Sequence, residues 1–387
     1  MKKALALILL IPFFTTAQQK TVKNVILLIG DGMGLAQMST AYYYGGDDEP
    51  NFSRFPIVGL INTSSAKQRV TDSAAGATAF ATGRRSYNGA ISVDTNRTNI
   101  PTITEVIRGR GIKSGLVVTS SITHATPACF YAHAESRREE EKIAQFLPGS
   151  GIHYFAGGGL KYFTQRSDNH DLIGAMLQRG FILDTTDLIP DGMIDPDKRY
   201  GYLLSPGGLP SKLEGRGDFL TEATKGALDY LSLNERGFFL MVEGSQIDWE
   251  GHGTNAIGII EEVKDFDKAV GVALDFAEKN GETIVIVTAD HETGGFALTP
   301  SVEDGESNYE NISPSFYEGA TKEESADHTA TLIPVLAYGP GASVFSGIYK
   351  NSDIYHKIME LTDWKAPIKM QAKTTLTGDD IPRKVVK

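Results

Sequence analysis

The chain has a single cysteine, Cys129, among its 387 residues. One cysteine cannot form an internal disulfide, so stability has to come from the packed core and from any bound metal. Basic residues are also in deficit, because 37 Lys and Arg residues face 48 Asp and Glu residues and the formal net charge is −11. Proteins that bind nucleic acid more often present a basic face, so this charge disfavours that class.

Long apolar runs are missing too, with one short exception at the N-terminus. Lys2 and Lys3 precede the apolar stretch Ala4–Phe14, and small residues follow as far as Ala17. This pattern is typical of a cleaved secretory signal peptide, and the run is too short to cross a bilayer comfortably. We therefore expect a signal peptide at residues 1–17, a periplasmic or secreted protein, and no stable membrane anchor.

The remaining composition, 41% hydrophobic and 22% charged, is that of a globular protein. Helical patterns, of which Ala256–Lys279 is the clearest, alternate with short apolar runs. This alternation predicts a three-layer α/β/α sandwich with a mostly parallel central sheet. The runs that read as parallel strands buried on both faces are Asn24–Ile29, Ser114–Val118, Phe238–Val242, Thr283–Thr288 and Ile333–Tyr338.

The domain organisation that we expect is one catalytic domain over residues 18–364. Within it, the less regular and partly Gly-rich segment 150–235 is predicted to be an insertion over the sheet. The polar, acidic segment 300–327 is predicted to be a variable loop, and residues 365–387 form a polar C-terminal tail.

Candidate functional residues gather just after the predicted strands. Asp31, Glu243, Asp290 and His291 each follow a strand. In open α/β sheets, ligands bind at the carboxyl ends of the strands, so these distant residues are expected to meet in one pocket. A single residue of this kind would be weak evidence, because Asp often starts a turn after a strand.

Two further residues have metal-ligand spacing. Asp248 and His252 are four positions apart, which places them on one face of a helical turn. Carboxylate and imidazole ligands suit zinc, although the same pair also fits an ordinary ion pair on a surface turn. Glu243, five residues earlier, favours the metal site, and His328 supplies a further candidate ligand before the strand at Ile333.

Two other segments carry groups that suit phosphate. Asp72 and Ser73 precede a run of small residues, and a serine at a helix N-terminus favours anions, although most such serines only cap the helix. Thr126 and Arg137 offer a hydroxyl and a planar guanidinium that matches phosphate oxygens. The alternative for Arg137 is a solvated helix face, because it lies in a charged run.

Together, these segments resemble the alkaline phosphatase family from about residue 22 to residue 364, with six motifs in family order. The segment VTDSAAGAT resembles the family's phosphoserine signature. The matching segments are Asn24–Gly34, Val70–Thr78, Thr123–Arg137, Val242–His252, Thr288–Gly295 and the stretch that begins at Asp327–His328.

The resemblance implies a role for each matched residue, with two Zn²⁺ and one Mg²⁺ per subunit. Ser73 would be the nucleophile, Arg137 would hold two phosphate oxygens, and Asp72 would orient Arg137. The first zinc would be held by Asp248, His252 and His328, and the second by Asp31, Asp290 and His291. Magnesium would be held by Asp31, Thr126 and Glu243. His124 and Trp249 differ from the residues Asp and Lys found at these places in the best-known bacterial member, so both lie near a metal or the phosphate in roles that the resemblance leaves open.

The function implied is metal-dependent hydrolysis of small phosphate monoesters through a phosphoserine intermediate, with broad specificity, an alkaline optimum and a homodimeric enzyme. The rivals are a sulfatase or phosphodiesterase of the same superfamily and a non-catalytic zinc- or phosphate-binding protein. A sulfatase would need Pro and Arg after its nucleophile, and the segment after Ser73 has neither. Glu243, Thr126 and Arg137 favour monoesters over diesters, and the complete residue set favours catalysis over simple binding.

Overall fold

The computed structural model describes residues 22–188, 194–303, 306–317, 321–322, 325–362, 364 and 383. The predicted signal peptide at 1–17 therefore lies outside the described residues, and so does the predicted C-terminal tail apart from Arg383. Within the described ranges, every helix is too short or too polar to cross a membrane.

A ten-stranded sheet forms the centre of the molecule, with the strand order β16-β2-β15-β8-β1-β7-β3-β4-β6-β5. Its strands, in chain order, are β1 (Asn24–Gly30), β2 (Ile57–Asn62), β3 (Lys113–Ser121), β4 (Tyr154–Gly158), β5 (Phe181–Asp184), β6 (Arg199–Leu203), β7 (Phe238–Gly244), β8 (Thr283–Thr288), β15 (Ile333–Tyr338) and β16 (Gly347–Lys350). Three small two-stranded pairs consist of β9 (Glu292–Thr293) with β14 (His328–Thr329), β10 (Phe296–Glu303) with β11 (Glu306–Phe316), and β12 (Thr321–Lys322) with β13 (Ser325–Ala326).

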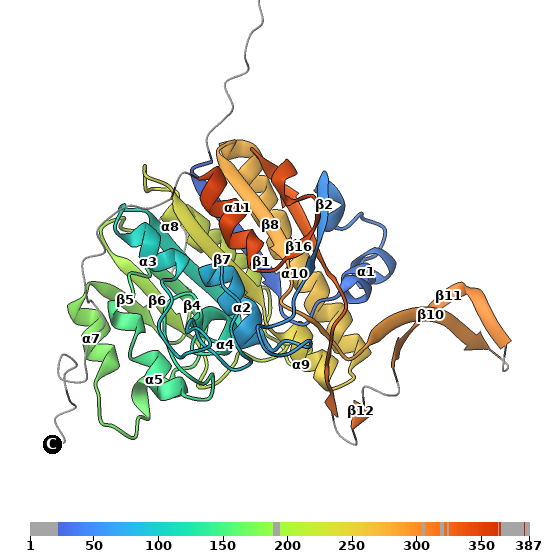
Figure 1. Cartoon of the computed structure of the whole chain (residues 1–387), viewed down its shortest axis with the longest axis horizontal. Helices are drawn as coiled ribbons and strands as arrows, with labels where there is room; N and C mark the ends of the chain where they lie inside the picture. The colour runs from blue at the N-terminus through green and yellow to red at the C-terminus, as the bar shows by residue number, and fades with distance from the viewer. Residues whose placement is uncertain are drawn as a thin grey trace, which may run out of the picture.

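Helices cover both faces of this sheet (Figure 1). They are α1 (Leu35–Tyr44), α2 (Ser73–Thr82), α3 (Ile103–Arg108), α4 (Ala125–Ala128), α5 (Glu140–Ala144), α6 (Lys161–Thr164), α7 (Leu172–Gln178), α8 (Phe219–Leu231), α9 (Gln246–His252), α10 (Ala256–Asn280) and α11 (Asp353–Leu361), with short 3-10 turns at Asn51–Arg54, Leu147–Gly149 and Ala342–Phe345. One layer contains α8 and α10, which pack on each other and on the central strands, and the other contains α2, α3, α4 and α11. The predicted three-layer sandwich with a mostly parallel sheet is confirmed.

All five predicted strands are present, and the central ones are buried along their whole length. The parallel direction predicted for Ile333–Tyr338 is wrong, because β15 runs antiparallel to both β8 and β2. The reason is local. His328 lies near the carboxyl end of β8, so β15, which begins five residues later, has to run in the opposite direction to β8.

Two segments differ from their predicted form. Residues 150–235, predicted as an insertion over the sheet, contribute β4, β6 and β5 to one edge of the sheet itself. Residues 300–327, predicted as a loop, lie largely in the β10–β11 hairpin, which projects from the body of the molecule (Figure 1), and in β12 and β13. Gly-rich or polar strands such as these lack the continuous apolar run that identifies a buried strand.

The register of the sheet sets the position of the candidate residues. Ile29 in β1 lies opposite Glu243 in β7 on one side and Thr288 in β8 on the other. Asp31 lies two residues after Ile29, and Asp290 lies two residues after Thr288. The carboxylates of Asp31, Glu243 and Asp290 therefore lie together at the carboxyl ends of these strands. Parallel pairing of fully apolar strands is therefore what collects the polar residues.

Away from that edge, a buried histidine links two segments of the α2–α3 layer. The Nδ1 atom of His133 lies 2.8 Å from the Ser92 carbonyl oxygen, and its Nε2 lies 3.1 Å from a carboxylate oxygen of Glu105. Both partners accept hydrogen bonds, so both ring nitrogens have to donate and the ring carries a positive charge. Burial acts to lower the pKa of His133, but the hydrogen bond and charge of Glu105 outweigh it and raise the pKa above its usual value.

This contact makes stability depend on pH. Because the folded pKa of His133 is raised, its contribution is fully present below an unfolded pKa of about 6.5 and is lost as pH rises through the folded pKa. The free energy of unfolding of the wild type should exceed that of His133→Gln by more near about pH 6 than near about pH 9. Urea denaturation of the metal-free proteins measures this difference, and Glu105→Gln should show the same weakened pH dependence. A difference that stays constant or grows with pH would contradict the charged pair.

Candidate metal and phosphoester site

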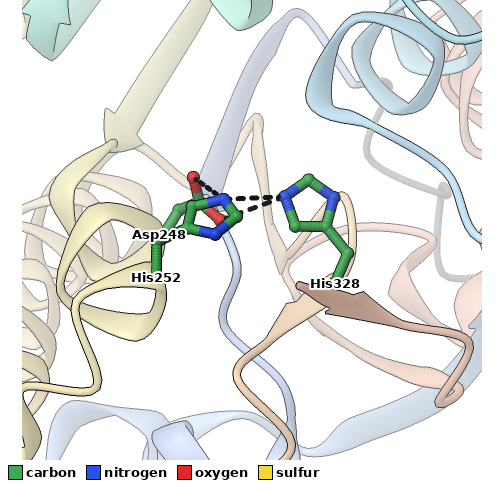
Figure 2. A group of neighbouring side chains, drawn as sticks. All are labelled: Asp248, His252 and His328. Carbon is green, nitrogen blue, oxygen red and sulfur yellow. Dashed lines mark hydrogen bonds and ion pairs between the residues drawn. The ribbon is translucent and has the colours of Figure 1, made fainter. Parts of the chain in front are cut away.

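The first candidate metal group contains Asp248, His252 and His328 (Figure 2). Asp248 and His252 are four residues apart in α9, and His328 comes from β14 across the site. The two Nε2 atoms of His252 and His328 are 3.1 Å apart, and each lies 3.5 Å from a carboxylate oxygen of Asp248. The Nδ1 of His328 lies 2.9 Å from the Thr71 carbonyl oxygen, which can only accept, so the lone pair of His328 is on Nε2 and faces the group.

The second group contains Asp31, Asp290 and His291, all fully buried. The Nε2 of His291 lies 3.2 Å from Asp290 Oδ2 and 3.5 Å from Asp31 Oδ1. Ser73 faces the same atom, with its Oγ 3.3 Å from His291 Nε2. The candidate nucleophile therefore lies directly against the second group.

The third group shares Asp31 with the second and adds Glu243 and His124. Glu243 Oε2 accepts hydrogen bonds from the hydroxyls of Ser245 and Ser120. Thr126 is buried in α4, two residues after His124. This is the oxygen-rich part of the site, as magnesium prefers.

The donor atoms of these groups fit divalent cations. Among the described residues, the buried side-chain atoms without a hydrogen-bond partner include both carboxylate oxygens of Asp31, Glu243 Oε1, Asp290 Oδ2 and Thr126 Oγ1. Leaving one such atom unsatisfied costs about 1–3 kcal/mol, so a cluster of them is explained best by ions that the atoms bind.

Electrostatics supports the same conclusion. Burial, and then the charges of neighbouring carboxylates, raises the pKa of Asp31 well above its usual value. Burial is also the main cause that raises the pKa values of Glu243 and Asp290. Protein groups alone leave this cluster with uncompensated negative charge, and bound cations would reverse those shifts.

The helix that carries Ser73 approaches closely because its residues are small. All ten residues of α2 are buried, and a Cβ added at Gly76 would lie 2.9 Å from Asp290 Cβ. Asp72 is the N-cap, since its side chain accepts from the Ala75 amide, so the alternative of Ser73 as the cap does not hold. Ser73 occupies the first turn, where free backbone N–H groups and the helix dipole favour an anion.

The Arg137 side chain faces the site. The alternative that its charged neighbours suggested, a solvated helix face, is therefore wrong. One guanidinium nitrogen lies 3.2 Å from Asp72 Oδ2 and 3.4 Å from Ser73 Oγ. The other, Nη2, lies 3.0 Å from His124 Nε2. A guanidinium only donates, so this histidine nitrogen accepts and Nδ1 carries the proton. Burial, together with Arg137, lowers the pKa of His124 to about 3, so its ring is neutral.

Trp249 stands at the mouth of the site and is 37% exposed. Its ring meets His124 edge to face, with centroids 5.8 Å apart. On its other side, a Cβ added at Gly208 would lie only 2.5 Å from the indole, so the backbone there packs closely against the ring. Every residue singled out from the sequence therefore lies in this one region.

The sequence reading missed the two residues of β9, Glu292 and Thr293. Glu292 is buried, and four donors surround its carboxylate: the Gln37 amide, the backbone N–H groups of Gly295 and Phe296, and the Thr329 hydroxyl. Because Thr329 follows His328, Glu292 anchors the strand that carries that ligand. The sequence signals were their place in the matched segment Thr288–Gly295 and their proximity to His291, neither of which indicates a role for either side chain.

Comparisons with known proteins agree with this geometry. The family model described as alkaline phosphatase matches residues 22–315. The structure of alkaline phosphatase from the Antarctic bacterium TAB5 is 48% identical, with a TM-score of 0.86, and the match covers 90% of this chain and 100% of that one. A variant of the TAB5 enzyme with one histidine replaced by aspartate has Mg bound in a site named M3.

Curated relatives give the same result. Alkaline phosphatase 4 of Bacillus subtilis is 34% identical over 404 residues, which cover 86% of this chain and 87% of the relative. Alkaline phosphatase of Escherichia coli K12 is 31% identical over 407 residues, covering 87% of this chain and 85% of the relative. The chain belongs to the alkaline phosphatase family and is an enzyme that hydrolyses phosphate monoesters.

Proposed function

We propose that the chain hydrolyses phosphate monoesters through a phosphoserine at Ser73, with two Zn²⁺ and one Mg²⁺ per subunit. The observation that carries this proposal is the set of buried, unpartnered ligand atoms that converge beside Ser73. Asp248, His252 and His328 would hold one zinc, and Asp31, Asp290 and His291 the other. Their nitrogen and carboxylate donors suit zinc.

When bound, the metals supply positive charge that stabilises the attacking and leaving oxygens of an in-line displacement. The chain's own groups do the rest. The Ser73 Oγ atom lies 3.3 Å from His291 Nε2, which places the hydroxyl directly beside the second zinc group. Ser73 gives up its hydroxyl proton to solvent, its Oγ atom forms a bond to phosphorus as the bond from phosphorus to the alcohol oxygen breaks, and the released oxygen takes a proton from water. Water then hydrolyses the phosphoserine to free Ser73 and phosphate.

Arg137 would bind two oxygens of the transferred phosphoryl group and stabilise their charge. Its ion pair with Asp72, at 3.2 Å, fixes the guanidinium beside Ser73 before substrate arrives. Free backbone N–H groups in the first turn of α2 add further donors for the same oxygens. The site is therefore organised around the phosphoryl group, which is the basis for the proposed broad specificity toward leaving groups.

For the third site we propose magnesium on oxygen atoms of Asp31, Thr126 and Glu243. His124 lies beside them, but its Nε2 accepts from Arg137 and its Nδ1 carries the proton. In that tautomer the ring offers no lone pair to a metal, so His124 acts mainly as a partner of Arg137. The histidine-to-aspartate variant of the TAB5 enzyme has Mg bound in its M3 site, which fits magnesium as the ion of a third site in this family.

Further properties belong to the same proposal. Residues 18–364 would form one catalytic domain, and the enzyme would be an exported homodimer that acts on small monoesters with an alkaline optimum. The excess of acidic over basic residues fits small substrates better than long polyanions. A sulfatase, a phosphodiesterase and a non-catalytic binding protein are the rivals, and release of p-nitrophenol from the phosphate, sulfate and bis-ester substrates separates them.

Replacing the nucleophile tests the covalent route. Ser73→Ala should lower kcat for p-nitrophenyl phosphate by at least about a thousandfold, because only direct attack by water remains. Rapid quenching with labelled substrate should label the wild type on Ser73 and leave the variant unlabelled. Zinc content measured on both proteins shows whether the metal groups survive the change. A metal-loaded variant with full activity would rule out Ser73 as the nucleophile.

Replacing Trp249 tests what lies at the mouth of the site. Trp249→Lys should bind inorganic phosphate more tightly, with an inhibition constant lower by on the order of tenfold, because an ammonium would join the Arg137 side of the site. Trp249→Phe is the matched control, since it keeps an aromatic ring without adding charge and should resemble the wild type. Equal or weaker inhibition of the Lys variant would show that Trp249 does not adjoin the phosphate.

A further inference from the structure

Thr293 lies between the two candidate zinc groups and is fully buried. Its hydroxyl donates a hydrogen bond to Asp248 Oδ1, in the first group. The hydroxyl oxygen of Thr293 also lies 3.2 Å from His291 Nδ1, in the second group. Asp248 Oδ1 and His291 Nδ1 are themselves 4.0 Å apart, so the hydroxyl bridges a separation too long for a direct hydrogen bond.

The direction of the two hydrogen bonds follows from proton count. A hydroxyl has one hydrogen, and the Asp248 carboxylate can only accept it. Toward His291 the hydroxyl oxygen therefore accepts, and the proton on that ring has to be on Nδ1. The lone pair of His291 is then on Nε2, which faces Asp31, Asp290 and Ser73. The Thr293 hydroxyl thus favours this tautomer in one group, where the Glu292 backbone also hydrogen-bonds the His291 ring, and orients a carboxylate in the other.

Packing fixes the Thr293 side chain in this orientation. A Cβ added at Gly32 would lie 2.7 Å from the hydroxyl oxygen, and one added at Gly251 would lie 3.0 Å from the methyl carbon. The Thr293 amide also donates to the Gly32 carbonyl at 3.1 Å, and Thr293 pairs with His328 in the β9–β14 ladder. The loop after β1, helix α9 and strand β14, which together carry four candidate ligands, all meet this residue.

We propose that Thr293 is a positioning residue whose hydroxyl links the two zinc groups, so that both bind metal more tightly than they would without it. The inference rests on the proposed function, because it assumes zinc at both groups. Removing a residue that hydrogen-bonds a metal ligand typically lowers metal affinity by about 10- to 100-fold. Thr293 contacts one ligand of each group, so its loss should weaken both.

Two substitutions separate the hydroxyl from the methyl group. Thr293→Val keeps the volume and the methyl contact with Gly251 but removes the hydroxyl, whereas Thr293→Ser keeps the hydroxyl and removes the methyl. Zinc binding to each metal-free protein is measured by competition with a chromophoric chelator, which gives two stepwise dissociation constants. Both constants should rise by roughly 10- to 100-fold in Thr293→Val, while Thr293→Ser stays close to the wild type.

Each other outcome contradicts the inference. Unchanged constants in Thr293→Val, or a change at one step only, would show that the hydroxyl does not link the groups. Equal losses in the Val and Ser variants would assign the effect to packing. If Thr293→Val does not fold by circular dichroism, Thr293→Ser against Thr293→Ala makes the same comparison without the methyl group. Failure of the wild type to bind two zinc ions would instead overturn the proposed function.

Discussion

The burial of three carboxylates at one edge of the sheet is the constraint on which the rest of the site depends. Asp31, Glu243 and Asp290 lie where β1, β7 and β8 end, and burial, followed by the charge of neighbouring carboxylates, opposes their ionisation. The strands that carry them are apolar and parallel, so the fold itself places these carboxylates close together in a buried region. Bound cations would compensate the negative charge of these carboxylates and would also supply the positive charge that phosphate chemistry needs.

In the proposed mechanism, the remaining parts of the site would hold phosphate beside the bound cations. A helix of small residues lets Ser73 approach His291 closely, and Gly76 leaves room for Asp290. Arg137 is held from one side by Asp72 and from the other by His124. The position of His124 explains why a histidine fits beside the third group, since it serves the guanidinium as an acceptor while its ring stays neutral.

Much of this could be predicted from the sequence, where the signal was local. Unbroken apolar runs identified β1, β7 and β8, the helical pattern over Ala256–Lys279 identified α10, and the positions of Asp31, Asp290 and His291 after strands indicated a shared pocket. The direction of β15 was predicted wrongly, because an apolar run carries no information about the direction of its strand. The strands β4 and β5 within 150–235 were missed because β4 is short and ends in two glycines, while β5 is short and partly exposed, so neither gives a long apolar run.

Thr293 and Glu292 show a different limit. Each acts through partners that are distant in the chain, such as Asp248 and Gln37, and neither has a pattern that sets it apart from an ordinary strand residue.

The most direct test of the proposed metal sites is anomalous diffraction on both sides of the zinc absorption edge from crystals of the zinc-loaded enzyme. Two zinc peaks are expected, one among Asp248, His252 and His328 and one among Asp31, Asp290 and His291. The absence of zinc peaks from both groups, whether or not peaks occur elsewhere on the molecule, would contradict the proposed zinc sites.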